Sequence, residues 1–115
     1  MFIDLHEFSI YIKPGRTDMR KQANGLSIIA EEVMGKNIQS KNIFLFCSRD
    51  RKLIKCLYWD RNGFCLWQKR LERDKYPWPG SEETARHITY EQLKMLLEGI
   101  DFFKAHKVIK YEEMS

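Results

Sequence analysis

The residues best suited to chemistry in this chain are basic and aromatic, and they are interleaved between positions 42 and 79. This stretch contains all three tryptophans and all three cysteines of the protein. Lysine and arginine form charge-assisted hydrogen bonds with phosphate, and aromatic rings stack on nucleobases. The pattern favours a nucleic-acid surface. The alternative is that the tryptophans are packed in the core and that the lysines and arginines are only solvent-exposed charges on strand edges.

The basic candidates for DNA binding fall into two groups. Three precede or begin an expected helix, where free backbone N–H groups would help to hold a phosphate, unless the cations are merely solvated or paired with Asp18. These three are Arg16, Arg20 and Lys21. The others lie within the aromatic stretch, along its expected strands and turns, and they are Arg49, Arg51, Lys52, Lys55, Lys69, Arg70 and Arg73. The tryptophans Trp59, Trp67 and Trp78 are candidate partner contacts.

No catalytic residue, metal site or cofactor is predicted. Cys47, Cys56 and Cys65 are odd in number and form no Cys-x-x-Cys pair, which argues against a disulfide framework and against zinc. They are predicted to be buried or half-buried strand cysteines in a reducing compartment. A two-metal strand-transfer site needs several converging carboxylates, whereas the aspartates here have separate capping or turn explanations.

The aromatic stretch is predicted to form a three-stranded antiparallel meander over residues 43–47, 53–60 and 64–71. Its second turn, Asp60-Arg61-Asn62-Gly63, is a hairpin signal with two competing registers. A two-residue loop of Asn62 and Gly63 places Trp59 opposite Leu66. A three-residue loop of Arg61, Asn62 and Gly63, with a bulge at Gly63, is favoured because Asp60 suits its first position. It places Trp59 opposite Cys65 and puts Trp59 and Trp67 on one face.

Support for the meander is expected from both ends of the chain. Residues 9–13 alternate like a strand that breaks at Pro14-Gly15, and a helix is predicted from Thr17 or Asp18 to about Met34, with Gly35 as its stop. Gly25 inside that helix costs about 1 kcal/mol relative to alanine, which suggests that another backbone approaches it.

A second helix is predicted to begin at Thr89, where Thr89-x-x-Gln92 is a capping box. Its apolar stripe includes Leu93, Leu96 and Ile100. Between the meander and this helix, the run Tyr76-Pro77-Trp78-Pro79-Gly80 reads as an aromatic loop folded back over the core.

These elements predict a single α+β domain over residues 1–103, with an antiparallel sheet of three to four strands and two helices, followed by a tail at 104–115. A chain of 115 residues with 43% hydrophobic content can bury a real core. Its net charge of +4 favours an anionic partner only weakly. No apolar run approaches the ~18 residues that span a bilayer, so a soluble, cytoplasmic protein without a membrane partner is expected.

Several motifs in a fixed order resemble a known family. They are Asp18-Met19-Arg20-Lys21, Asn24-Gly25-Leu26, Leu57-Tyr58-Trp59-Asp60, Gly63-Phe64, Leu66-Trp67, Lys69-Arg70-Leu71-Glu72, Trp78-Pro79 and Leu96-Leu97-Glu98-Gly99-Ile100-Asp101. Together they resemble TnpB, the second-frame accessory protein of IS66-type bacterial insertion sequences. The chain departs from that pattern at Asp74, where glycine is usual, and at Lys52-Leu53, where an aspartate followed by a basic residue is usual.

The resemblance implies a role in transposition beside a separate, larger transposase that cuts the DNA. It therefore implies a non-catalytic accessory protein rather than an enzyme. Two hypotheses follow for its partner. The favoured one is binding of DNA, at the insertion-sequence ends or non-specifically, through a basic surface flanked by aromatic rings. The alternative is a module that docks the transposase through an apolar patch containing Trp78 and the second helix, without touching DNA.

Overall fold

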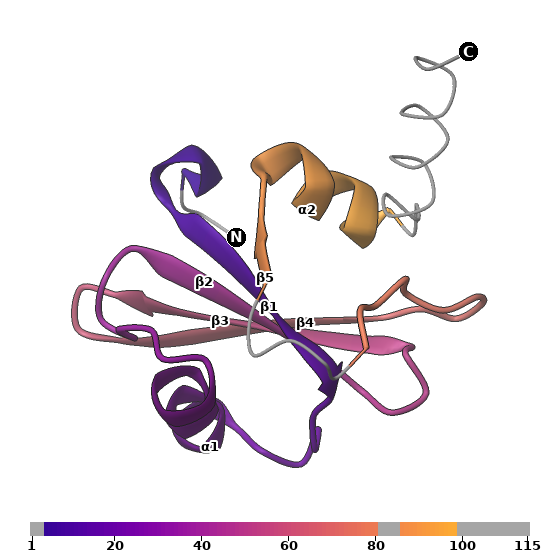
Figure 1. Cartoon of the computed structure of the whole chain (residues 1–115), viewed down its shortest axis with the longest axis horizontal. Coiled ribbons are helices and arrows are strands. Elements are labelled where there is room, and N and C mark those ends of the chain that lie inside the picture. The colour runs from indigo at the N-terminus through magenta and orange to yellow at the C-terminus, as the bar shows by residue number, and fades with distance from the viewer. Residues whose placement is uncertain (1–3, 81–85, 99–115) are drawn as a thin grey trace.

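A five-stranded sheet lies between two helices in the computed structural model, which describes residues 4–80 and 86–98 (Figure 1). The strand order across the sheet is β4-β3-β2-β1-β5. The strands are β1 (Ser9–Arg16), β2 (Asn42–Cys47), β3 (Leu53–Asp60), β4 (Gly63–Arg70) and β5 (Arg86–Ile88). The helices are α1 (Ala23–Ile28), which continues as a π-helical turn over Ile29–Val33, and α2 (Tyr90–Leu97). The α+β prediction with two helices is confirmed.

The prediction of a purely antiparallel sheet of three to four strands is wrong. The β2-β3-β4 meander is antiparallel as expected, but β1 pairs in parallel with β2, from Ser9 opposite Asn42 to Ile12 opposite Leu45. Two parallel strands need a crossover long enough to bring the chain back, and the segment containing α1 supplies it. The short strand β5 then adds antiparallel to β1 and completes a mixed sheet.

Strand β1 does not end at Pro14-Gly15 but passes through it. The pairing with β2 shifts register between Ile12 and Arg16, and Gly15 has a φ of +74°, so the two residues form a bulge in the strand. A bulge tolerates proline because no ladder hydrogen bond is required of its missing N–H. Pairing resumes with Arg16 opposite Cys47, which fixes the position of Arg16 at the end of the sheet.

Neither predicted hairpin register is present. Asp60 pairs with Gly63 around a two-residue loop, so Trp59 lies opposite Phe64, and the two rings meet edge to face with centroids 4.9 Å apart. That aromatic contact is a cross-strand interaction that turn residues alone cannot reveal. Trp67 lies opposite Cys56, so the side chains of these two residues share one face of the sheet. Cys56 is three residues before Trp59 on β3, so the side chain of Trp59 points to the other face. The two tryptophans therefore lie on opposite faces of the sheet, contrary to the prediction.

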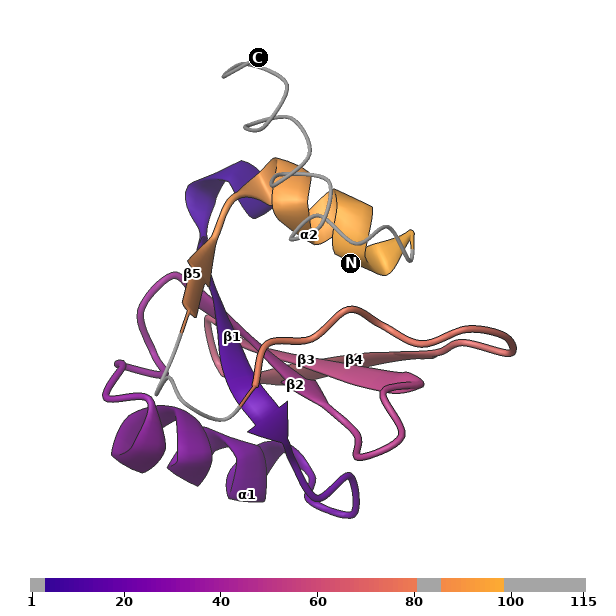
Figure 2. The ribbon, with the colours of Figure 1, turned by 45° about the vertical axis from the view of Figure 1, so that its right-hand side comes forward.

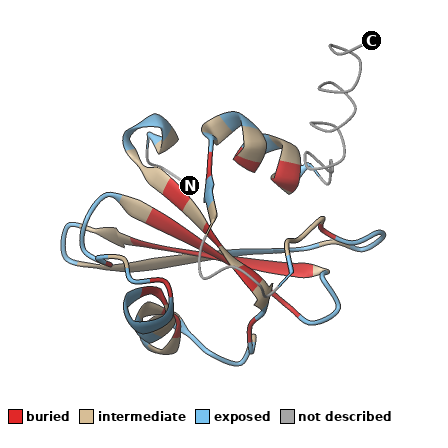
Figure 3. Ribbon diagram, viewed as in Figure 1, coloured by how far each residue is buried: buried red, intermediate tan, exposed pale blue. Residues whose placement is uncertain are grey.

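Each face of the sheet has its own hydrophobic core. Figures 1 and 2 show α1 and α2 on opposite sides of the sheet, and Figure 3 shows the buried residues concentrated between these layers. On the α1 side, Leu26 and Ala30 pack with Phe44, Phe46 and Leu57. The core on the α2 side contains Ile12, Leu45, Ile54, Tyr76, Leu93 and Leu96. Because both faces are covered, β2 and β3 are continuous apolar runs.

The first helix begins later than predicted. Residues 17–22 form a turn in which the Asp18 carboxylate accepts a hydrogen bond from the backbone N–H of Arg20, and the helix starts at Ala23. It stops where expected, with Gly35 at a φ of +69°. The predicted approach of another backbone to Gly25 is wrong, because a Cβ at that position would instead meet side-chain carbons of Lys21 at 3.2 and 3.3 Å.

The second helix has the predicted start. The Thr89 hydroxyl accepts from the backbone N–H of Gln92, and the Gln92 side chain accepts from the backbone N–H of Thr89, which is a complete capping box. Leu93 and Leu96 are buried against the sheet. Ile100 and the predicted tail at 104–115 lie outside the described residues. None of the described helices is long and apolar enough to cross a membrane.

The cysteines are buried or half-buried strand residues, as predicted, and this makes their reactivity testable. Cys47 and Cys56 are buried, and burial raises the pKa of each thiol to about 12, whereas Cys65 is half-buried. We expect maleimide labelling of the native protein near neutral pH to modify Cys65 first and the other two slowly, because the thiolate is the reactive form. Mass spectrometry would identify the sites. Rapid labelling of all three cysteines in the native protein would contradict the burial of Cys47 and Cys56 in the core.

Candidate nucleic-acid interface

Three strands bring their C-terminal ends to the same end of the sheet. Strand β2 runs parallel to β1, and β3 reverses direction between β2 and β4, so β1, β2 and β4 all point the same way. Arg16 ends β1, Arg49 follows β2 in the loop to β3, and Arg70 ends β4. The topology thus gathers arginines from three distant parts of the chain at one edge.

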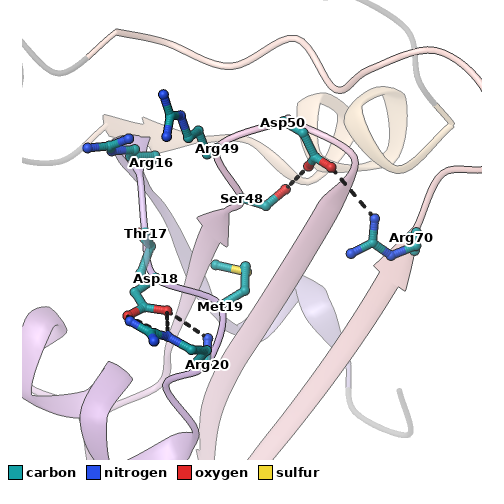
Figure 4. Close-up of a pocket in the computed structure, with 9 residues that line it drawn as sticks. All are labelled: Arg16, Thr17, Asp18, Met19, Arg20, Ser48, Arg49, Asp50 and Arg70. Atoms are coloured by element: carbon teal, nitrogen blue, oxygen red, sulfur yellow. Dashed lines mark hydrogen bonds and ion pairs between the residues drawn. The ribbon is translucent and has the colours of Figure 1, made fainter.

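An open cleft of about 840 Å³ occupies this edge (Figure 4). It is lined by Arg16, Thr17, Asp18, Met19, Arg20, Ser48, Arg49, Asp50 and Arg70. A smaller hollow of about 190 Å³ shares Arg16, Ser48 and Arg49 with the cleft. Its other lining residues are Gly15, Arg51, Trp78, Pro79 and Gly80. We call the two together the arginine cleft.

Positive charge is concentrated in the arginine cleft. Five arginines and two aspartates line it, which leaves a side-chain charge of +3, compared with +4 for all 115 residues. Arginine remains protonated at every physiological pH and presents a planar fork of donors that matches phosphate. The modest net charge of the sequence therefore understates the local attraction for an anion.

The carboxylate of Asp18 shapes the loop that follows β1. It accepts hydrogen bonds from the backbone N–H of Arg20 at 3.0 Å, from Arg20 Nε at 3.0 Å and from Arg20 Nη2 at 2.8 Å (Figure 4). These bonds with Arg20 lower the pKa of Asp18 to about 2. Pairing of Arg20 with Asp18, one of the alternatives open from the sequence, is thus present, although the Arg20 side chain is 91% exposed.

The carboxylate of Asp50 shapes the second arginine-bearing loop. It accepts from the Ser48 hydroxyl at 2.6 Å and from the backbone N–H of Lys52 at 3.1 Å, and it lies 3.8 Å from Arg70 Nη1. The hydrogen bond from Ser48 is the main reason that the pKa of Asp50 is lowered. Within this loop Arg51 has a φ of +60°, a conformation that costs a non-glycine residue energy and tends to be retained at functional sites.

Thr17 contributes a buried hydroxyl beside the cleft. Its backbone N–H donates to the carbonyl of Cys47 at 2.8 Å, and its side-chain oxygen has no hydrogen-bond partner among the described residues. Buried polar groups are nearly always paired, and the Thr17 hydroxyl, which lines the cleft, is an exception. Thr17, Ser48 and Asp50 were not predicted as site residues, because no motif in the sequence distinguishes them.

Only part of the predicted basic set lines the cleft. Arg16, Arg20, Arg49, Arg51 and Arg70 do, whereas Lys21, Lys52 and Arg73 do not. Lys55 is 3% exposed, and its Nζ donates to the backbone carbonyls of Met19 at 2.7 Å and Lys21 at 3.1 Å. Lys69 Nζ donates to the carbonyl of Leu97 at the end of α2. Lys55 is therefore a support for the loop after β1 rather than an available phosphate contact.

The three tryptophans have different surroundings. Trp59 is half-buried beside the hairpin turn, and Trp67 packs against the core on the α2 side. Trp78 alone lines the arginine cleft. Its Nε1 donates to the carbonyl of Lys13 at 2.9 Å, and the backbone N–H of Gly15 donates to the carbonyl of Pro79. The predicted aromatic loop is thus folded back on the core and tied to the end of β1.

A sequence profile of IS66 Orf2-like proteins matches residues 8–107 of this chain. The chain belongs to the IS66 Orf2-like family. Members of this family are accessory proteins associated with transposition.

Two curated proteins are similar to this chain, and both come from Sinorhizobium fredii (strain NBRC 101917 / NGR234). The uncharacterized protein y4hO is 39% identical over 93 residues, which cover 81% of each chain. The uncharacterized protein y4jC is 28% identical over 90 residues, which cover 78% of this chain and 77% of that protein. No solved structure matches the chain.

The support role of Lys55 in this IS66 Orf2-like protein predicts a stability effect. Replacing Lys55 with methionine keeps the apolar stem but leaves the carbonyls of Met19 and Lys21 without their buried donor, so we expect a loss of about 1–3 kcal/mol in urea denaturation. Amide hydrogen exchange in the loop at 17–22 should accelerate as well.

Lys69 provides the matched control, because its Nζ donates to one carbonyl at an exposed site. Lys69→Met should cost clearly less than Lys55→Met. Equal costs for the two variants would show that the loop does not depend on the buried ammonium group.

Proposed function

We propose that this IS66 Orf2-like protein binds DNA through the arginine cleft during transposition of its insertion sequence. The observation that carries the proposal is the convergence of five arginines from separate segments on one end of the sheet. Guanidinium groups are suited to phosphate oxygens, and contacts with phosphates hold a protein on DNA without reading its sequence. Binding is therefore expected at many sequences.

The dimensions of the cleft suit several successive phosphates. Arg16, Cys47, Ile54 and Lys69 form one row across β1, β2, β3 and β4, so Arg16 and the end of β4 are separated by three strand spacings, or roughly 14 Å. One DNA strand advances about 3.4 Å along the helix axis for each phosphate. A DNA strand lying across this end of the sheet would thus pass all three arginine-bearing segments of the protein.

The acids of the cleft support an accessory rather than a catalytic role. Asp18 is engaged by Arg20, and Asp50 is engaged by Ser48 and the backbone of Lys52, so both carboxylates act on loop shape. Among the described residues, no group of three histidine, cysteine or acidic side chains is placed to hold a metal ion. The proposal leaves DNA cutting to the separate transposase.

The salt dependence of binding tests the proposal. Fluorescence anisotropy with a labelled duplex between about 50 and 200 mM salt should give a steep negative slope of log K against log salt. Arg16→Gln, Arg49→Gln and Arg70→Gln should each reduce that slope by about one unit. Arg61→Gln is the control, because Arg61 is also exposed but lies at the hairpin turn and does not line the cleft. A slope unaffected by the cleft substitutions would contradict the proposal.

Docking of the transposase is a second candidate, favoured by a different surface. The patch expected from Trp78 and α2 is largely used internally, because Leu93 and Leu96 are in the core. Ile28 and Val33, in contrast, are 53% and 50% exposed on the helical segment that starts with α1. Exposed apolar side chains are a feature of protein contacts. If this candidate holds, Ile28→Lys with Val33→Lys should lower co-purification with the transposase and leave DNA affinity unchanged.

A further inference from the structure

We infer that the arginine cleft prefers an unpaired DNA strand, with one base stacked on Trp78 while the arginines hold the flanking phosphates. The inference rests on the proposed function and names the class of DNA that the same site takes. It starts from Trp78, the only described tryptophan that lines the cleft. Trp78 lines the smaller hollow, which shares Arg16, Ser48 and Arg49 with the larger one.

The sizes of the two hollows suit different parts of a nucleotide strand. The larger one, at about 840 Å³, carries four of the five arginines and is wide enough for sugar and phosphate groups. The smaller one, at about 190 Å³, is below the ~300–1,000 Å³ of pockets that hold a whole drug-sized ligand. It suits a single planar ring, and Trp78 and Pro79 supply apolar surface for one.

Trp78 is held in place before any ligand arrives. Its indole N–H donates to Lys13, and the loop that carries it is fixed on one side by the bond from Gly15 to Pro79. On the other side, the backbone N–H of Tyr76 donates to the carbonyl of Arg51 at 2.7 Å. The aromatic loop is thus hydrogen-bonded directly to the loop between β2 and β3, which carries Arg49 and Arg51. A fixed ring loses little conformational entropy when a base stacks on it.

The geometry favours an unpaired strand over a duplex because of where the bases are. In a duplex, a base must first leave the stack to reach a protein ring, and this costs a few kcal/mol. In a single strand the base is already available, and stacking on an aromatic side chain tolerates any base. An aromatic ring beside cations along one groove is the arrangement used by proteins that bind single strands.

The test uses the full-length wild-type protein and three labelled probes of about 16 nucleotides at low salt. The probes are a single strand, the same strand in a duplex, and a strand of equal length with abasic sites in the middle. We expect the single strand to bind roughly tenfold more tightly than the duplex and than the abasic strand, since stacking one base contributes a factor of about 5 to 150.

Two substitutions separate the ring from its other roles. Trp78→Phe and Trp78→Leu both lose the indole N–H, but only phenylalanine keeps an aromatic face. Trp78→Leu should weaken binding of the single strand about fivefold or more relative to Trp78→Phe, while duplex affinity stays the same for both. The comparison of probes on the wild-type protein still decides the matter if a variant fails to fold.

The outcomes distinguish the preference for an unpaired strand from the proposed binding of DNA by the arginine cleft. Equal affinity of wild-type protein for all three probes would overturn the preference for an unpaired strand and leave DNA binding by the cleft intact. Loss of affinity in Arg49→Gln for both strand and duplex, together with tighter binding of the single strand, would support both claims. Failure of every probe to bind at low salt would overturn both.

Discussion

Replacing Arg16 and Arg49 together with glutamate should weaken DNA binding roughly 100-fold or more at about 100 mM salt. Both residues line both hollows of the arginine cleft. The double substitution leaves three arginines against four acids, which changes the side-chain charge of the cleft from +3 to −1. Both positions are exposed, so the free energy of unfolding should change little, as urea denaturation would verify.

The control for this pair makes the same change in total charge elsewhere. Arg61 and Lys94 are exposed and do not line the cleft, so Arg61→Glu with Lys94→Glu should reduce affinity only slightly. Comparable losses from the two double variants would mean that binding responds to net charge alone. In that case the arginine cleft would not be the site of contact.

Replacing Tyr76 with alanine should have the largest effect on stability, with a loss of about 3–5 kcal/mol in the free energy of unfolding. Tyr76 is 1% exposed in the core on the α2 side. Its hydroxyl donates to the carbonyl of Lys69 at 3.2 Å, and its backbone N–H donates to Arg51. The alanine variant would leave a cavity under the aromatic loop and remove the anchor that holds Trp78 beside the cleft.

Tyr76→Phe separates the ring from the hydroxyl. It retains nearly all the buried surface and loses one hydrogen bond, so it should cost only about 1 kcal/mol in the same urea denaturation. A loss below about 1 kcal/mol for Tyr76→Ala would contradict the placement of this loop in the core. It would also remove the basis for a fixed Trp78.

The features that could be predicted from the sequence depend on local patterns. The capping box at Thr89, the left-handed glycine at position 35 and the three meander strands each have a signature within a few residues, and each is present. The aromatic loop was predictable for the same reason. Its prolines exclude helix and central strand, and its rings need burial.

The features that could not be predicted depend on contacts between distant residues. The parallel pairing of β1 with β2 follows from the path of the crossover, for which no short motif exists. The observed hairpin register brings the rings of Trp59 and Phe64 into contact across the two strands, an interaction that the turn residues alone do not reveal.

The candidate site was predicted as a set of residue types but not as a place. Convergence of Arg16, Arg49 and Arg70 requires three strands to point the same way, so a purely antiparallel sheet could not show it. Lys55 and Lys69 occupy opposite faces of the sheet, and only the structure reveals that the first is enclosed by the loop after β1.

The most direct test of the central claim is to map DNA on the protein by NMR. Backbone amide spectra of isotope-labelled protein, titrated with an oligonucleotide of about 16 nucleotides at low salt, report which residues change environment. We expect the largest shifts in residues 15–20 and 48–52 and at Arg70, with smaller changes elsewhere. Shifts concentrated on residues 28–33 or on the hairpin at 60–63, with the arginine cleft unchanged, would contradict the account.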